Sequence, residues 1–404
     1  SITALSVISD VALNSSGTAT IGVNDVVSSA SDNCGSPTIT ISPSTFTCSE
    51  LGSNTVTITA TDAAGNSAST QVTVTVVDNA APSITTISGA VTVTLDASGA
   101  ATITSSDVVS STSDNCTSAP TVTITPSTFG CSDLGSNAVT ITATDASGNV
   151  STATKSVTVV DATAPTISAS NATLTLNSNG IALLPSSTAT ATDNCTSSPS
   201  ISYSQSTFSC ADLGSNTVTV TATDASGNTS TSTITVTVQD NTAPSITALS
   251  VISDVALNSS GTATIGVNDV VSSASDNCGS PTITISPSTF TCSELGSNTV
   301  TITATDAAGN SASTQVTVTV VDNAAPSITT ISGAVTVTLD ASGAATITSS
   351  DVVSSTSDNC TSAPTVTITP STFGCSDLGS NAVTITATDA SGNVSTATKS
   401  VTVV

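Results

Sequence analysis

The fold is decided by the run Thr55-Val56-Thr57-Ile58-Thr59-Ala60-Thr61, the turn sequence Asp62-Ala63-Ala64-Gly65-Asn66, and a second alternating run from Ser69 to Val77. Apolar and polar residues alternate through both runs, and most are β-branched, which is typical of strands with one buried face. The Asp-x-x-Gly-Asn sequence between them has turn chemistry. The stretch therefore predicts a β-hairpin. The same hairpin recurs with its turn at Asp145, Asp224, Asp306 and Asp389.

Around each hairpin the chain repeats a larger module. The first cysteines of the five copies are spaced by 82, 79, 83 and 82 residues. Each module also carries one phenylalanine, which we interpret as a core residue. The repeat predicts five modules: 1–78, 79–161, 162–240, 241–322 and 323–404. Ser1 to Val160 recurs letter for letter as Ser245 to Val404, so the fourth and fifth modules copy the first and second. We expect the chain to be part of a longer array.

The composition excludes several classes of partner. Acidic residues outnumber basic ones 27 to 2, the basic ones being Lys155 and Lys399, and there is no histidine. A chain this acidic is repelled by nucleic acid and by anionic membrane surfaces, so cations are the expected partners. The sequence holds no run of eighteen apolar residues, and we expect no membrane contact within it. The expected partners are neighbouring modules of the same chain.

Each module contains two cysteines separated by 13 or 14 residues. The spacing favours one disulfide per module, because a module of this size has a small core that a crosslink would stabilise. Free thiols are the alternative, whereas two cysteines without histidine cannot complete a zinc site. Disulfides indicate an oxidising, extracellular or cell-surface location. The expected pairs are Cys34 with Cys48, Cys116 with Cys131, Cys195 with Cys210, Cys278 with Cys292, and Cys360 with Cys375.

Short strands with frequent turn signals predict an all-β fold, in which immunoglobulin-like β-sandwich modules follow one another end to end. The string from Phe208 through Leu213-Gly214-Ser215-Asn216 to Asp224-Ala225-Ser226-Gly227-Asn228, closing at Asp240-Asn241-Thr242-Ala243-Pro244, resembles the hyalin repeat (HYR) and HYR-like modules. The resemblance covers all five modules. It implies an immunoglobulin-like fold and a role in adhesion, or as a stalk, in giant surface proteins of the kind found in Bacteroidota.

Catalysis is not expected. The chain has no histidine or arginine and no cluster that combines a nucleophile with a base. We therefore predict that it is not an enzyme.

Calcium is the one cofactor that the sequence suggests, because hard cations bind carboxylate and carbonyl oxygens. The strands of the main hairpin are antiparallel, so its turn and the aspartate that ends the module lie at opposite ends. The turn of each module would then meet the linker of the module before it. The alternative is that each aspartate and asparagine only caps its own turn. The candidate ligands, junction by junction, are Asp78, Asp114, Asp145 and Asn149; Asp161, Asp193, Asp224 and Asn228; Asp240, Asp276, Asp306 and Asn310; and Asp322, Asp358, Asp389 and Asn393.

The leading hypothesis is a structural or adhesive extracellular fibre or stalk, in which each module adds length and contacts mainly its neighbours. One alternative is that the repeats bind a ligand, such as a glycan, ice or a host surface, through Thr-rich strand faces. Another is that copies of the chain polymerise into a surface filament. The sequence does not decide between these alternatives.

Overall fold

The computed structural model describes residues 1–404 without a gap. Contacts divide the chain into two compact units. The first consists of Ser1–Ala169, Ala189–Ser204 and Thr219–Thr233, and the second of Ser170–Thr188, Gln205–Val218 and Ile234–Val404. The first two modules therefore belong to the first unit, the last two belong to the second, and the third contributes segments to both.

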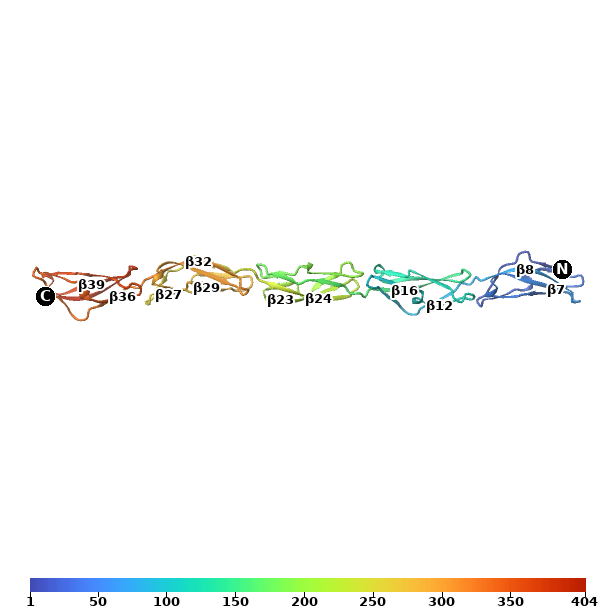
Figure 1. Cartoon of the computed structure of the whole chain (residues 1–404), viewed down its shortest axis with the longest axis horizontal. Helices are drawn as coiled ribbons and strands as arrows, with labels where there is room; N and C mark the ends of the chain where they lie inside the picture. Colours follow the sequence, from blue (N-terminus) through green and yellow to red (C-terminus); the bar gives the residue numbers. More distant parts are fainter. The chain divides into compact units, whose positions relative to one another are not determined.

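The first module contains eight strands, coloured blue in Figure 1. They are β1 (Ile2–Ala4), β2 (Val11–Ala12), β3 (Thr18–Thr20), β4 (Val27–Ala30), β5 (Thr38–Ser42), β6 (Thr45–Thr47), β7 (Gly52–Thr61) and β8 (Ser67–Val77). Two short 3-10 helices, η1 (Val23–Asp25) and η2 (Cys48–Glu50), connect them.

The same succession of strands recurs in the other four modules. The second has β9 (Ser83–Thr86), β10 (Val91–Thr94), β11 (Ala100–Thr102), β12 (Val109–Ser113), β13 (Thr121–Thr125), β14 (Thr128–Gly130), β15 (Gly135–Thr144) and β16 (Val150–Val160). The third has β17 (Thr166–Ala169), β18 (Ala172–Thr175), β19 (Ile181–Leu183), β20 (Ala189–Thr192), β21 (Ser200–Tyr203), β22 (Thr207–Ser209), β23 (Gly214–Thr223) and β24 (Thr229–Gln239). The fourth has β25 (Ser245–Ala248), β26 (Val255–Ala256), β27 (Thr262–Thr264), β28 (Val271–Ser275), β29 (Thr282–Ser286), β30 (Thr289–Thr291), β31 (Gly296–Thr305) and β32 (Ser311–Val321). The fifth has β33 (Ser327–Thr330), β34 (Val335–Val337), β35 (Ala344–Thr346), β36 (Val353–Ser357), β37 (Thr365–Thr369), β38 (Thr372–Gly374), β39 (Gly379–Thr388) and β40 (Val394–Val403).

Helical structure is limited to short connections. These are η3 (Ser105–Asp107), η4 (Cys131–Asp133), η5 (Ser186–Thr188), η6 (Cys210–Asp212), η7 (Val267–Asp269), η8 (Cys292–Glu294), η9 (Cys375–Asp377) and the four-residue α1 (Ser349–Val352). None of the helices is long and apolar enough to cross a membrane.

The predicted hairpin is the centre of the larger sheet. In the first module β7 and β8 pair antiparallel from Gly52 opposite Val76 to Thr61 opposite Ser67. The sheet order is β2-β8-β7-β5, with β2 parallel to β8. Two smaller antiparallel pairs, β1 with β4 and β3 with β6, complete the module. Alternate residues of β7 are buried, as the apolar/polar alternation predicts. The predicted all-β array of immunoglobulin-like modules is confirmed.

The core of each module lies beneath this hairpin. In the first module Phe46 of β6 packs with Val56 and Ile58 of β7 and with Val74 and Val76 of β8, and all five side chains are buried. The equivalents of Phe46 are also buried, which confirms the predicted role of the single phenylalanine of each module as a core residue: Phe129, Phe208, Phe290 and Phe373.

Strands β5 and β6 run in the same direction along the module but belong to different sheets. Thr38 of β5 lies opposite Thr61 at the end of β7, and Ser42 lies opposite Thr57 in its middle. The chain then leaves this sheet, pairs with β3 as β6, and reaches Cys48 just before β7 begins. One crossing of the module therefore separates its two cysteines. We call the end with Cys34 and the Asp62 turn the turn end, and the end with Cys48 and Asp78 the linker end.

Candidate metal centres at the module junctions

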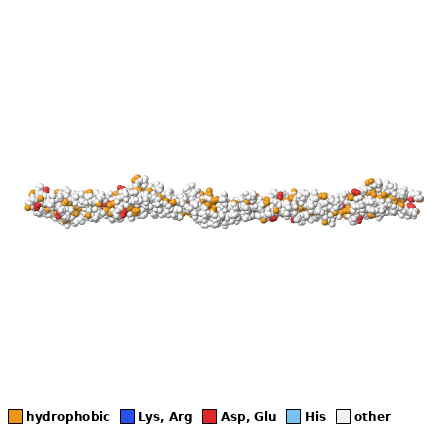
Figure 2. All heavy atoms as spheres, turned by 45° about the horizontal axis from the view of Figure 1, so that its top comes forward, with side chains coloured by type: hydrophobic (Ala, Val, Ile, Leu, Met, Phe, Trp, Pro, Cys, Tyr) orange, Lys and Arg blue, Asp and Glu red, His pale blue; other side chains and the backbone are white.

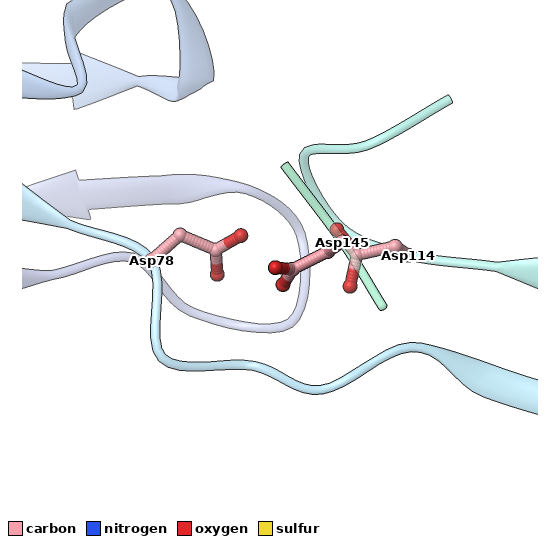
Figure 3. Close-up of side chains that lie close together, drawn as sticks. All are labelled: Asp78, Asp114 and Asp145. Carbon is pink, nitrogen blue, oxygen red and sulfur yellow. The ribbon is translucent and has the colours of Figure 1, made fainter. Parts of the chain in front are cut away.

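Three carboxylates meet where the linker end of the first module contacts the turn end of the second. Asp78 follows β8, Asp114 follows β12, and Asp145 follows β15. One carboxylate oxygen of each lies within 4.8 Å of those of the other two. Figure 3 shows the three side chains pointing toward one another from the two modules. The antiparallel hairpin thus brings together the aspartates that the sequence predicts as neighbours.

The arrangement recurs at every junction between consecutive modules. The other clusters are Asp161 with Asp193 and Asp224, Asp240 with Asp276 and Asp306, and Asp322 with Asp358 and Asp389.

These clusters contain buried oxygens without a hydrogen-bond partner. Asp78 and Asp145 are only 5% and 7% exposed. Oδ2 of Asp78, Oδ1 of Asp114 and the amide Oδ1 of Asn115 are buried and have no hydrogen-bond partner. Burying such atoms is unfavourable unless something compensates. The second and third junctions also contain buried oxygens without a hydrogen-bond partner, in Asp161, Asp193 and Asn194 and in Asp240, Asp276 and Asn277.

The other oxygens of the cluster are held by backbone amides. Oδ2 of Asp114 accepts hydrogen bonds from the backbone N–H groups of Cys116 and Thr117, at 2.9 and 2.8 Å. Oδ1 of Asp78 accepts from the N–H of Ala80 at 3.1 Å. These bonds fix the orientation of each carboxylate and leave its second oxygen directed elsewhere.

Asp145 caps its own turn, as the turn-cap interpretation predicts. Its Oδ1 accepts from the backbone N–H of Asn149 at 2.7 Å. The Asn149 side chain then connects the modules, because its amide nitrogen donates to Oδ2 of Asp145 and to the backbone oxygen of Asp78. The sequence predicts that Asn149 lies against Asp78 as a candidate ligand, and in the structure its side chain lies there and contacts the cluster through its amide nitrogen. Asn228, Asn310 and Asn393 make the equivalent contacts.

Asn115, the second residue of the Asp-Asn pair that begins at Asp114, also contacts the preceding module. Its amide nitrogen donates to Oδ1 of Asp78 and to the backbone oxygen of Asn14, both at 3.1 Å and both in the preceding module. Asn194, Asn277 and Asn359 make the equivalent contacts. The Asp-Asn-Cys sequence that precedes the first cysteine of every module is the signal for this role.

Positive charge is scarce around these carboxylates. The only two basic side chains are engaged elsewhere: Nζ of Lys155 donates to the backbone oxygens of Ile87 and Gly89, and Lys399 makes the equivalent bonds.

At the second junction, burial raises the pKa of Asp224, but hydrogen bonds from the side chain and backbone of Asn228 outweigh it, so the pKa is lowered overall. Asp306 behaves in the same way with Asn310. These two aspartates are therefore held in the ionised form.

The cysteines pair across the same junctions, and the predicted pairing within modules is wrong. The bonds are Cys48–Cys116, Cys131–Cys195, Cys210–Cys278 and Cys292–Cys360. Bonded cysteines have Cα atoms less than about 7 Å apart, whereas the two cysteines of one module lie at opposite ends of a strand ten residues long, roughly 33 Å. Cys34 and Cys375, at the two ends of this series, are free and exposed.

A glycine at each junction leaves room for the crosslink. Gly17 has φ +76°, and a Cβ there would lie 2.6 Å from the backbone oxygen of Asn115 and 2.7 Å from Sγ of Cys48. A larger residue would therefore force the two modules apart. Gly99, Gly180 and Gly261 occupy the same place at the other junctions.

The cluster dimensions fit a hard divalent cation. Ca²⁺ binds six to eight oxygens at about 2.3 to 2.6 Å, so two ligands on opposite sides of the ion lie roughly 4.6 to 5.2 Å apart. The three carboxylate oxygens lie within 4.8 Å of one another, and the amide oxygen of Asn115 is a further buried oxygen in the junction. The clusters can therefore bind a metal ion.

Outside the junctions, the surface offers fewer candidates. Figure 2 shows one face covered mainly by backbone and by side chains that are neither hydrophobic nor charged, with hydrophobic and acidic side chains scattered on it. Hollows of about 520 and 450 Å³ lie in the first and fourth modules, beside the exposed Val7 and Val251. No residue of the main hairpins lines them.

No protein-family model matches the chain, and no curated protein matches it. Solved structures that resemble it include the Protocadherin GammaB4 extracellular domain, at 17% identity over 96% of this chain and 75% of that chain, with a TM-score of 0.28. Protocadherin Gamma B2 extracellular cadherin domains 1-5 match at 16% identity over 98% and 93%, with a TM-score of 0.26. Sidekick-1 immunoglobulin domains 1-5 match at 12% over 89% and 88%, with a TM-score of 0.29. At TM-scores below 0.5 these likenesses carry no argument about the fold, binding or activity of this chain.

Proposed function

We propose that this chain is a structural or adhesive segment of an extracellular array, and that calcium ions bound between its modules hold their junctions in one arrangement. The observation that carries the proposal is the repeated cluster of three carboxylates, in which buried oxygens such as Oδ2 of Asp78 have no hydrogen-bond partner. A bound cation would supply the missing partner and offset the negative charge.

Both modules contribute to each cluster, which links the ion to the junction. Asp78 comes from one module, and Asp114 and Asp145 come from the next. An ion that binds all three oxygens therefore stabilises the contact between modules as well as the modules themselves. Separating the modules would break its coordination.

The location and the adhesive role rest on further observations. Four disulfides favour an oxidising environment, such as a cell surface. The relation to hyalin repeats, on the Asp-x-x-Gly-Asn motif and its flanking strands, is part of the proposal. A tandem array of repeated modules with only 1% aromatic residues suits a stalk that adds reach.

The experiment compares two aspartates with the same local sequence. Asp276 lies in the third cluster, whereas Asp32, its copy in the first module, belongs to none of the four clusters. Each accepts a hydrogen bond from the backbone N–H of the cysteine two residues later, so Asp276→Asn and Asp32→Asn disturb the same local contact. Calorimetric titration of the full chain should count four calcium ions for the unaltered protein, three for D276N and four for D32N.

Thermal unfolding gives a second measurement. Binding at 100 times the dissociation constant stabilises a site by about 2.7 kcal/mol, so millimolar calcium should raise the Tm of the unaltered chain above its value in chelator. No heat of binding and no shift in Tm at millimolar calcium would disprove the calcium proposal. If D276N and the unaltered chain bind the same number of calcium ions, the third cluster is not a calcium site.

A further inference from the structure

We propose that the disulfides transmit tension along the array. Force applied to the two ends of the chain then does not pass through most of its polypeptide, and the chain extends very little. This function goes beyond cation-stabilised junctions, because it depends on covalent connectivity alone. Each bond joins the linker end of one module to the turn end of the next. The shortest covalent path through an interior module therefore runs from its first cysteine to its second.

In the second module this path is the short segment between Cys116 and Cys131, which are 15 positions apart. Cys116 is bonded to the preceding module and Cys131 to the following one. The segment crosses the module once, through β13 and β14. The equivalent segments lie between Cys195 and Cys210 and between Cys278 and Cys292.

The remaining polypeptide of the three interior modules lies inside closed covalent rings. The ring closed by Cys48 and Cys116 contains β7, β8, the linker and Asp78, and the ring closed by Cys131 and Cys195 contains β15 and β16. Force applied at the chain ends does not pass through these parts. The three aspartates of the first cluster are all within rings, so a bound cation would not have to withstand the load.

The segment that does bear the load is anchored in both sheets. β13 pairs with β15 from Thr121 opposite Thr144 to Thr125 opposite Thr140, and β14 pairs with β11. Phe129 of β14 is 4% exposed, in the core of the module. Pulling the segment straight would require this side chain to leave the core.

The available extension follows from the length of the segment. Fifteen residues span at most roughly 50 Å, at about 3.3 to 3.6 Å per residue. The folded module already spans about 35 Å, since its longest strands have ten or eleven residues at about 3.3 Å each. An oxidised interior module can therefore lengthen by only about 15 Å plus the slack at its crosslinks, whereas a reduced module of 82 residues would release roughly 250 Å.

Single-molecule force spectroscopy of the full chain, held at its two termini, tests the proposal. Both arms contain chelator, so calcium does not vary, and one arm contains a disulfide reductant. The oxidised chain should show no unfolding step near 250 Å from its interior modules, and the reduced chain should show such steps repeatedly. Steps of this length from interior modules of a chain with four intact disulfides would overturn the proposal.

A variant that lacks one crosslink locates the effect. Cys210→Ser combined with Cys278→Ser opens the third ring, whose cysteines are 68 residues apart. Roughly 230 Å of additional extension, at about 3.3 to 3.6 Å per residue, should therefore be released from the third and fourth modules under oxidising conditions while the other rings stay closed. Cys34→Ser, which removes a free thiol, should leave the force curve unchanged. If the double variant does not fold, the reduced unaltered chain still decides the question. If the double variant folds and pulls like the unaltered chain, tension does not pass through this disulfide.

Discussion

The first and fourth modules have the same sequence but different surroundings. Comparing them shows which contacts form within a module and which require a neighbouring module. The Asp62 turn and the Asp306 turn have the same internal hydrogen bonds, with the backbone N–H of Asn66 or Asn310 donating to the aspartate at 2.8 Å. Only Asn310 also donates to a preceding module, at the backbone oxygen of Asp240. The turn is therefore a property of the module, whereas the cluster is a property of the junction.

The cysteines of the two copies differ in the same way. Cys278 is bonded to Cys210, whereas its copy Cys34 is free and exposed. The same local sequence therefore leaves the cysteine bonded in one copy and free in the other, so the residues around a cysteine do not decide its pairing.

The largest expected difference between the copies concerns this crosslink. Cys278→Ser opens a ring with a sequence separation of 68 residues, which is worth about 4 kcal/mol in the chain-entropy model. The third and fourth modules should lose about that much unfolding free energy in urea titrations, whereas Cys34→Ser should leave the unfolding free energy unchanged. Thiol counting after unfolding checks the pairing: we expect two free thiols in the unaltered chain, three in C278S and one in C34S. An unaltered chain without free thiols would contradict the pairing across junctions.

A smaller difference is expected for the asparagine of the turn. Asn310→Ala removes hydrogen bonds to Asp306 and to Asp240, whereas Asn66→Ala removes only the bond to Asp62. At about 1 kcal/mol for each bond, N310A should destabilise its module by roughly 1 kcal/mol more than N66A. Hydrogen exchange at the two turns measures the difference, and equal protection in the two variants would show that the contact with Asp240 contributes nothing.

The smallest difference should appear at low pH. Hydrogen bonds from the side chain and backbone of Asn66 lower the pKa of Asp62 below 3.8. At Asp306 burial raises the pKa, but the bonds from Asn310 outweigh it and the pKa is again below 3.8. The stabilisation by each ionised carboxylate is therefore complete above pH 3.8 and is lost as pH falls through the lower pKa of the folded state.

Carboxyl ¹³C titration of the full chain measures both values, with Asp62→Asn and Asp306→Asn to assign the signals. Both midpoints should lie below 3.8 in chelator. Calcium should lower only the midpoint of Asp306, since only that residue belongs to a complete cluster. A midpoint above 3.8 at either residue would contradict the predicted ionisation, and an equal calcium effect on both would show that the junction is not required.

Local sequence predicts a large part of this architecture. Alternation over Thr55 to Thr61 and the Asp-x-x-Gly-Asn turn are enough to predict the hairpin, because a half-buried strand and a turn each have a short-range signature. The antiparallel arrangement of that hairpin also predicts that Asp145 lies beside Asp78.

The cysteine pairing could not be predicted from spacing alone. Fourteen intervening residues suit a hairpin that returns to its start, and the continuation from β13 to β14 in another sheet is set by tertiary packing around Phe129. Yet Asp114 lies at the turn end, and the strand that begins at Gly135 starts at the linker end. These two placements already put Cys116 and Cys131 at opposite ends of the module. Combining those two assignments would have excluded the bond within the module.

The covalent rings also determine how the array responds to proteolysis. The linker between Asp78 and Pro82 lies between Cys48 and Cys116, so a protease that cuts one peptide bond there leaves the two products joined by the disulfide. The other linkers are protected in the same way. Between Cys48 and Cys360, while the four disulfides are intact, a single cut separates the chain only within 117–130, 196–209 and 279–291, where folded strands oppose cleavage.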